Sequence, residues 1–224
     1  MTLPAYVGFV NAGFFRAEGA RAQDQKPRNL RINSQAVIHW FQELAYEREA
    51  RFLRTYWYDA RFESGHVLEE GQRRFFTALT QTPGIQLRLG TIVEHRPWFE
   101  PGIREALNRT ASALQIEPQD LMDEFDRQWT FRPERRQRGV DVLMCADLIR
   151  LACRQAFDTA ILCSGDRDLF EAARTAQEYG VRVVIATPDR QSISRELNRL
   201  ADEIIEFDQD DLRLMLPPRL PHPD

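Results

Sequence analysis

Short apolar runs alternate with amphipathic stretches along most of this chain. Continuous apolar runs predict buried strands at 5–10, 52–58, 85–93, 159–163, 181–186 and 203–207. Apolar residues at three-to-four spacing predict helices over about 34–45, 71–81, 140–156, 166–179 and 192–200. Strands that are apolar throughout are typical of parallel sheets, because helices cover both faces of such sheets. The pattern therefore predicts an α/β domain with a mainly parallel sheet covered by helices.

Three segments break this rhythm. Residues 16–32 are polar and contain glycine and proline, so we expect a loop there. Residues 97–131 hold prolines around two helical stretches and predict a helical insertion, with a short extended piece at 129–133 returning the chain to the sheet. The proline-rich tail, 213–224, is expected to be disordered. We predict one domain over residues 1–212.

Composition narrows the class of protein. The 224 residues are 43% hydrophobic and 29% charged, which is typical of a soluble globular domain. No segment approaches the ~20 apolar residues of a membrane span, and the N-terminus lacks the basic region of a signal peptide, so we expect a cytoplasmic protein without membrane contact. The net charge of −4 argues against a general nucleic-acid coat protein. All but one of the 30 basic residues are arginine, which suits bidentate contacts with phosphate.

Polar residues follow the predicted strands at the edge where parallel sheets bind ligands. Asn11 ends the first strand, Asp166 and Asp168 follow the 159–163 strand, and Asp141 precedes the 140–156 helix. Each acid alone is explained by helix capping or by the helix dipole. Three acids that converge repel one another unless a cation balances them, and oxygen ligands of this kind select Mg²⁺ or Mn²⁺. The combination points to phosphodiester hydrolysis with metal-activated water.

These residues also carry a resemblance to a known family. The segment 132–186, with Gly-Val-Asp at 139–141 and Ser-Gly-Asp-Arg-Asp at 164–168, resembles the core of the NYN domain family, which is LabA-like and belongs to the PIN-like nucleases. The segment 192–205 resembles the closing part of that domain, and 9–15 its opening strand.

The resemblance implies a PIN-like three-layer sandwich, bound Mg²⁺ or Mn²⁺, and RNA as the substrate. The catalytic and metal-binding positions that it implies are Asn11, Asp141, Asp166 and Asp168. Ser164 would shape the loop that holds the last two acids. Asp147 is a second-tier candidate, and we expect it to be solvated.

Position 11 departs from the family, whose opening motif normally carries Asp there. Asn11 keeps an oxygen ligand but removes one negative charge, so we expect metal binding and catalysis to be weakened or lost. Three accounts stay open: an engineered inactive variant, which we favour; a natural degenerate nuclease that only binds; and a site in which the remaining acids suffice.

Basic residues flank the candidate site in the sequence. One group, around Arg16, follows Asn11, and a second, made of Arg132, Arg135, Arg136 and Arg138, precedes Asp141. We expect both to contact RNA phosphates without reading sequence. Tyr58, near the end of the second strand, is a candidate for stacking on a base.

Two hypotheses follow from these observations. The first is a metal-dependent ribonuclease, and the second is a catalytically silent RNA- or protein-binding module on the same fold. A phosphatase of the haloacid dehalogenase type is excluded, because Asn11-Ala12-Gly13 supplies neither acid that this chemistry needs after the first strand. The insertion at 97–131 is expected to gate the substrate, or to contact a protein partner or a second copy of the chain.

Overall fold

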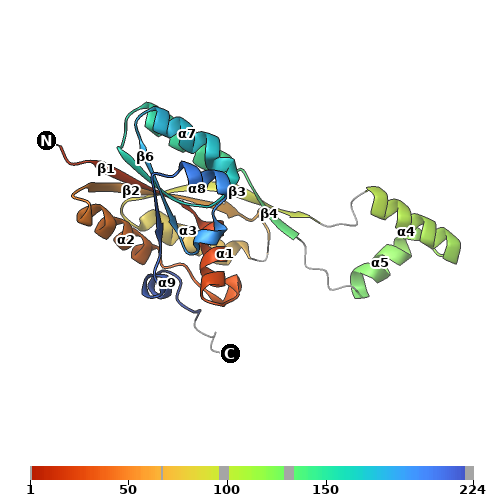
Figure 1. The fold of residues 1–224 in the computed structure, drawn as a ribbon. Coiled ribbons are helices and arrows are strands. Elements are labelled where there is room, and N and C mark those ends of the chain that lie inside the picture. The colour runs from red at the N-terminus through yellow and green to blue at the C-terminus, as the bar shows by residue number, and fades with distance from the viewer. Residues whose placement is uncertain (1, 67, 96–100, 129–133, 220–224) are drawn as a thin grey trace. The chain divides into compact units, whose positions relative to one another are not determined.

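The computed structural model describes residues 2–66, 68–95, 101–128 and 134–219. The chain forms two compact units, one made of Met1–Thr91 with Gly139–Asp224 and the other of Ile92–Arg138. The predicted fold class is confirmed, because a mainly parallel sheet is flanked by helices (Figure 1).

Within the described residues the sheet has seven strands, in the order β4-β3-β2-β1-β5-β6-β7. The strands are β1 (Ala5–Asn11), β2 (Arg51–Arg61), β3 (Ile85–His95), β4 (Glu134–Arg138), β5 (Thr159–Cys163), β6 (Arg182–Thr187) and β7 (Glu203–Glu206). The central strand β1 pairs in parallel with β2 on one side and with β5 on the other. Asn11 lies opposite Tyr58, and Val10 lies opposite Cys163. The carboxyl ends of β1 and β5 therefore lie side by side.

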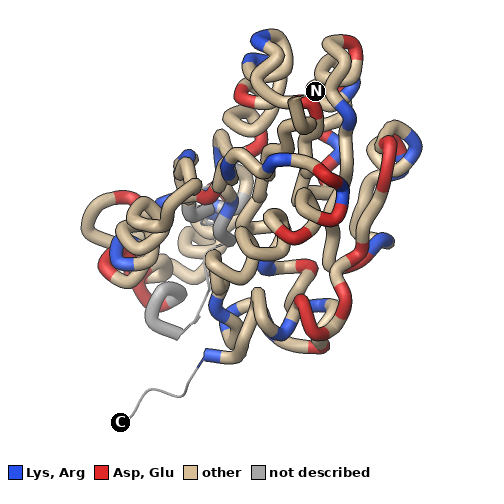
Figure 2. Tube along the Cα trace, turned by 90° about the vertical axis from the view of Figure 1, so that its left-hand side faces the viewer, with Lys and Arg blue, Asp and Glu red and all other residues tan. Residues whose placement is uncertain are grey.

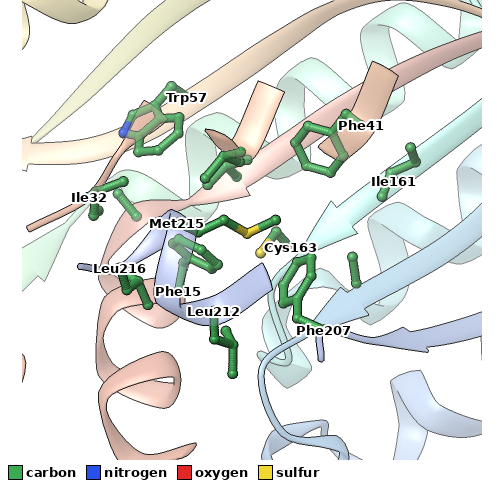
Figure 3. Packing of buried hydrophobic residues seen from close by; sticks show 14 of the residues in the cluster. Phe15, Ile32, Phe41, Trp57, Ile161, Cys163, Phe207, Leu212, Met215 and Leu216 are labelled. Atoms are coloured by element: carbon green, nitrogen blue, oxygen red, sulfur yellow. The ribbon is translucent and has the colours of Figure 1, made fainter. Parts of the chain in front are cut away.

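Helices cover the two faces of the sheet. Those of the larger unit are α1 (Ala12–Ala22), α2 (Ser34–Glu47), α3 (Glu69–Gln81), α6 (Val140–Cys153), α7 (Phe170–Glu178), α8 (Arg195–Leu200) and α9 (Gln209–Met215). Buried side chains of α1, α2, α3 and α9 pack with alternate residues of the strands in one hydrophobic cluster. Figure 3 shows Trp57, Ile161 and Cys163 of the sheet beside Phe15, Phe41 and Met215 of these helices. The remaining alternate positions form the other face, where α6 packs on β1 and β2.

The close packing of α2 on the sheet depends on a glycine. A Cβ atom added at Gly8 of β1 would lie 2.8 Å from the ring of Phe41. That distance is shorter than a carbon–carbon contact allows, so the ring of Phe41 fills the space that a side chain at position 8 would take. Phe41 is fully buried there and also stacks on Phe52.

The prediction of a loop over 16–32 was wrong in its first part, since α1 extends to Ala22. The side-chain oxygen of Asn11 accepts a hydrogen bond from the backbone N–H of Phe14 and thereby caps the helix. Phe15 and Ala20 supply its buried face. Small residues in α1 hide the helical periodicity in the sequence. One of them, Gly19, is small because a Cβ atom there would meet the side chain of Leu216.

The prediction of a disordered tail from residue 213 was also wrong as far as the structure describes it. Helix α9 continues to Met215, and Met215 and Leu216 are buried in the core. Beyond the helix, Pro217 accepts a backbone hydrogen bond from Arg31 (3.0 Å), and Arg219 donates one to Asn29 (2.7 Å). The apolar side chains of α9 anchor this segment, whereas residues 220–224 lie outside the described part.

The smaller unit holds the end of β3, helices α4 (Pro101–Leu114) and α5 (Pro118–Gln128), and β4. The two helices lie in the segment for which a helical insertion was predicted, and they contact each other. Ala111 of α4 is fully buried. The extended piece predicted at 129–133 lies outside the described residues. Across the described ranges, no helix has the length and apolarity that a membrane crossing requires.

Two leucines of α9 test whether this helix anchors the fold. Leu212 is fully buried, whereas Leu214 is 64% exposed. We expect Leu212→Ala to lower the free energy of unfolding by about 2–5 kcal/mol, because it leaves a cavity in the core. The matched change Leu214→Ala should stay within about 0.5 kcal/mol of the unchanged protein. Urea denaturation followed by circular dichroism measures both, and equal effects would mean that α9 does not contribute to the core.

Candidate active site

Asn11 connects three elements at the carboxyl end of β1. It is only 6% exposed, its side-chain oxygen caps α1 through the N–H of Phe14 (3.1 Å), and its Nδ2 donates a hydrogen bond to Oδ1 of Asp141 (3.0 Å). Asp141 lies in the first turn of α6, two residues after Gly139. Gly139 has a φ of +82°, a conformation that glycine adopts without strain, and it turns the chain from β4 into the helix. Position 11 and Asp141 therefore meet, as the sequence predicts.

The loop after β5 places the other two acids. Ser164 is fully buried, and its Oγ accepts a hydrogen bond from the N–H of Asp166 (3.4 Å). Oδ1 of Asp166 accepts the N–H of Asp168 (3.0 Å), so Asp166 also caps the short 3₁₀ helix η3 (Arg167–Leu169). Both acids remain exposed to solvent. Ser164 thus has the loop-shaping position that the sequence predicts for it.

Gly165 is required here by close packing. A Cβ atom at this position would lie 2.4 Å from the backbone oxygen of Ser192 and 3.0 Å from the Cα of Ile193. The carbonyl of Gly165 also accepts a hydrogen bond from the N–H of Ser194 (2.9 Å). The segment that precedes α8 therefore fixes the position of the loop that carries Asp166 and Asp168.

The three acids form an electrostatically strained group. Burial, and then the negative charges of Asp166 and Asp168, raise the pKa of Asp141 above its usual value. In the described part of the chain, none of the three carboxylates forms an ion pair with an arginine or a lysine. The polar partner that Asp141 does have is the uncharged amide of Asn11. Among the described residues, no arginine or lysine therefore compensates the negative charge of this group by an ion pair.

The donor types at this position fit a hard divalent cation, since carboxylate and amide oxygens are the ligands that Mg²⁺ and Mn²⁺ prefer. Their arrangement is not that of a finished metal centre. Among the described residues, no group of three or more His, Cys, Asp or Glu side chains is gathered closely enough to hold an ion. Asp166 and Asp168 are exposed, so their side chains have room to turn towards Asp141.

Cys145 is a neighbour of the acids that the sequence analysis did not single out. It lies one helical turn after Asp141, and its Sγ donates to the backbone oxygen of Asp168 (3.5 Å). Burial, followed by the charges of the three acids, raises the pKa of the Cys145 thiol to about 11. The thiol is therefore neutral at pH 7 and unreactive. The spacing of four residues from Asp141 on a predicted helix is the signal that could have found it.

Asp147 was predicted to be solvated, and the structure contradicts this. It is 7% exposed and accepts hydrogen bonds from the hydroxyl of Tyr58 (3.2 Å) and from Nε of Arg88 (3.0 Å). Arg150 forms an ion pair with its other oxygen. Burial favours the neutral carboxyl group, but the hydrogen bonds from Arg150 and Arg88 outweigh it and hold the pKa of Asp147 below its usual value. Asp147 is thus a structural acid, and β3 supplies a partner that periodicity does not reveal.

Tyr58 was predicted to stack on a base, and this is also wrong. Its side chain is fully buried, its hydroxyl donates to Asp147, and its ring stacks on Phe9 at a centroid distance of 6.4 Å. No face of the ring is open to a ligand.

The arginines that were predicted to contact phosphate differ in their exposure to solvent. Arg16 is partly buried, and burial lowers the pKa of its guanidinium, while the nearby Asp59 opposes this. Arg136 and Arg138 are exposed on β4. Arg132 and the side chain of Arg135 lie outside what the structure describes. Figure 2 shows acidic and basic residues interspersed along the trace, in keeping with the small net charge.

The fold and this edge define an α/β protein with an acidic site beyond its central parallel strands. Residues 100–208 match the NYN domain family. Asp141, Asp166 and Asp168 lie within this range. The predicted resemblance to the NYN domain family is thereby confirmed over these residues.

Two individual proteins are similar to this chain. The uncharacterized protein y4oD of Sinorhizobium fredii (strain NBRC 101917 / NGR234) is 42% identical over 76 residues, which are 33% of this chain and 36% of that protein. The match thus spans about a third of the relative's length. A crystal structure of VPA0982, a protein of unknown function from Vibrio parahaemolyticus RIMD 2210633, aligns over 93% of this chain and 95% of its own with a TM-score of 0.55 and 16% identity. That likeness concerns the fold alone.

The repulsion among the acids predicts an unusual effect on stability. Asp166→Asn keeps the capping oxygen but removes one of the charges that raise the pKa of Asp141. In metal-free buffer at low ionic strength and pH 7, we expect this variant to be more stable than the unchanged protein by about 0.2–1 kcal/mol. Urea denaturation in the presence of a chelator measures it. A loss of stability would show that the charges do not oppose each other in solution.

The same type of substitution at Asp147 should have the opposite effect. Asp147→Asn leaves Arg88 and Arg150 without their acid, so we expect it to cost about 1–3 kcal/mol at pH 7. Because the pKa of Asp147 is lowered in the folded state, its contribution is present above the unfolded value of ~3.9 and is lost as the pH falls through the folded value. The difference between variant and parent should therefore shrink below about pH 4. A difference that does not change with pH would contradict an ionised Asp147.

Proposed function

We propose that this protein is a metal-dependent nuclease that hydrolyses RNA phosphodiester bonds at the carboxyl edge of β1 and β5, and that Asn11 weakens it. One observation supports the proposal: the charges of Asp166 and Asp168 act on Asp141, and none of the three acids has a basic ion-pair partner in the described part of the chain, within the region that matches the NYN domain. A fold that brings side chains of like charge near one another is unfavourable unless a ligand of opposite charge binds and offsets their repulsion. Nucleases of the NYN and PIN-like type generally use divalent metals, which would be that ligand.

Each residue of the proposed site has its own role. Asp141, Asp166, Asp168 and the side-chain oxygen of Asn11 would hold Mg²⁺ or Mn²⁺, which when bound lowers the pKa of water and offsets the charge of the phosphate. Ser164 orients the loop that carries the two exposed acids. Arg136 and Arg138, which are exposed and precede Asp141 in the sequence, are the proposed phosphate contacts.

Asn11 weakens the site in two ways. Its neutral amide supplies no charge, and its Nδ2 occupies an oxygen of Asp141 that a cation would need. A hydrogen bond to a charged group contributes ~1.5–3 kcal/mol, so a cation that must displace it binds roughly 10- to 100-fold more weakly. An aspartate at position 11 would donate no such bond and would add a fourth carboxylate.

The second candidate function is a catalytically silent RNA-binding module. The same hydrogen bond favours it, because Asp141 has a polar partner even without a cation. In either case we propose that the compact helical segment around α4 and α5 contacts a protein partner or a second copy.

Changing position 11 separates the two functions. We expect Asn11→Asp to cleave labelled RNA in the presence of Mn²⁺ or Mg²⁺ and to stop when a chelator is added. The unchanged protein should cleave at least ~10²-fold more slowly, because the activated water is misplaced. Adding Asp166→Asn to Asn11→Asp should abolish cleavage again. Cleavage is followed by gel electrophoresis, and RNA binding is measured separately by fluorescence anisotropy.

Asn33 provides a matched control. It caps α2 as Asn11 caps α1, through the N–H of Ala36, and belongs to a different helix. Asn33→Asp should leave RNA cleavage at the level of the unchanged protein. If Asn11→Asp binds RNA but cuts nothing with any divalent metal, the nuclease is ruled out and the silent module is the better account.

A further inference from the structure

A groove of about 550 Å³ follows the outer strand of the sheet, far along the strand order from β4. It is lined by β7, by residues of α2 that include Trp40, Glu43 and Glu47, and by Asp208 and Asp211 at the start of α9. We call it the β7 groove. It does not overlap the acidic site described above, and nothing in the proposed nuclease chemistry uses it.

Strand β7 offers unpaired backbone groups to this groove. It stands last in the sheet, and within the described ranges β6 is its one neighbour. The N–H of Phe207, directly after the strand, points inward to the oxygen of Thr187 (2.9 Å). Because successive residues of a strand turn their N–H and C=O groups to opposite sides, those of Ile204 and Glu206 point to the open side. Such groups are a template for another strand.

Acidic side chains surround this open edge. Glu203 is paired with Arg48 and Arg182, but other carboxylates line the groove: Glu43, Glu47, Glu206, Asp208 and Asp211. Asp211 is held in place by a hydrogen bond from Nε1 of Trp40 (2.9 Å). Arg48 is the one basic residue in the lining. The groove is therefore strongly negative as well as able to form backbone hydrogen bonds.

We propose that the β7 groove binds an extended, arginine- or lysine-rich segment of a partner protein, which adds as a strand beside β7. Backbone hydrogen bonds would hold the segment, and the carboxylates would select basic side chains at alternate positions. Pairing of β7 with a second copy is disfavoured, because it would bring Glu203 and Glu206 close to their own counterparts. RNA is repelled by the same charges.

A short synthetic peptide tests this proposal on the full chain. We expect a fluorescently labelled peptide of about nine residues that alternates arginine and valine to bind in ~50 mM salt, as measured by anisotropy. A peptide with proline in place of alternate valines should not bind, since proline cannot donate to a ladder. Hydrogen exchange should show new protection at the amides of Ile204 and Glu206. Equal binding of the proline peptide, or unchanged exchange in β7, would overturn strand addition.

Charge variants locate the site. Glu47→Gln combined with Glu206→Gln should weaken binding roughly 3- to 10-fold, because two of the carboxylates are lost. Glu105→Gln combined with Glu117→Gln removes the same charge from exposed positions in the smaller unit and should leave binding unchanged. Asp166→Asn should also leave it unchanged, which excludes binding at the acidic site. Equal weakening in the groove variant and either control, or no binding of the arginine peptide at all, would overturn the proposal and leave the carboxylates as protection of an edge strand.

Discussion

The side chain of Asn11 joins the end of β1 to the starts of two helices, and the candidate site depends on this junction. Its oxygen caps α1 and its nitrogen holds Asp141 of α6, so one short amide sets the distance between both helices and the central strand. A carboxylate at this position could keep the cap but not the donated bond. The amide therefore makes the junction complete in itself, and a carboxylate would make it depend on a cation. The fold without a cation favours an amide at position 11, whereas metal binding favours a carboxylate there.

Helix α6 shows two solutions to buried negative charge within two turns. Asp147 is surrounded by Tyr58, Arg88 and Arg150, and its pKa is lowered below its usual value. Asp141 faces other acids, and its pKa is raised. The first arrangement stabilises the fold without a ligand, whereas the second remains unfavourable until one binds. The contrast separates a structural acid from a candidate metal ligand more clearly than burial does.

The sequence predicted those features that depend on local spacing. Continuous apolar runs predicted the strands, and the positions of Asp141, Asp166 and Asp168 predicted that their charges would act on one another at one edge of the sheet, although the described side chains are not gathered closely enough to hold an ion. It failed where a partner comes from a distant strand or helix. The burial of Asp147 depends on Arg88 of β3, that of Tyr58 on the ring of Phe9, and helix α1 on a cap by the residue that was considered only as a ligand. Small residues in α1 and prolines after α9 gave no periodic signal, although both segments are fixed by packing around Leu216.

The close approach at Gly165 has a consequence for how this protein can change over time. Because the backbone of Ser192 and Ile193 lies against Gly165, the connection between β6 and α8 serves as a template for the loop that carries two of the acids. Surface connections usually accept added or deleted residues. This one does not have that freedom, since a change in its length would shift the template and carry Asp166 away from Asp141. We infer that variation among descendants of this chain will accumulate in other connections, while the length of this one is inherited unchanged wherever the acidic site is kept.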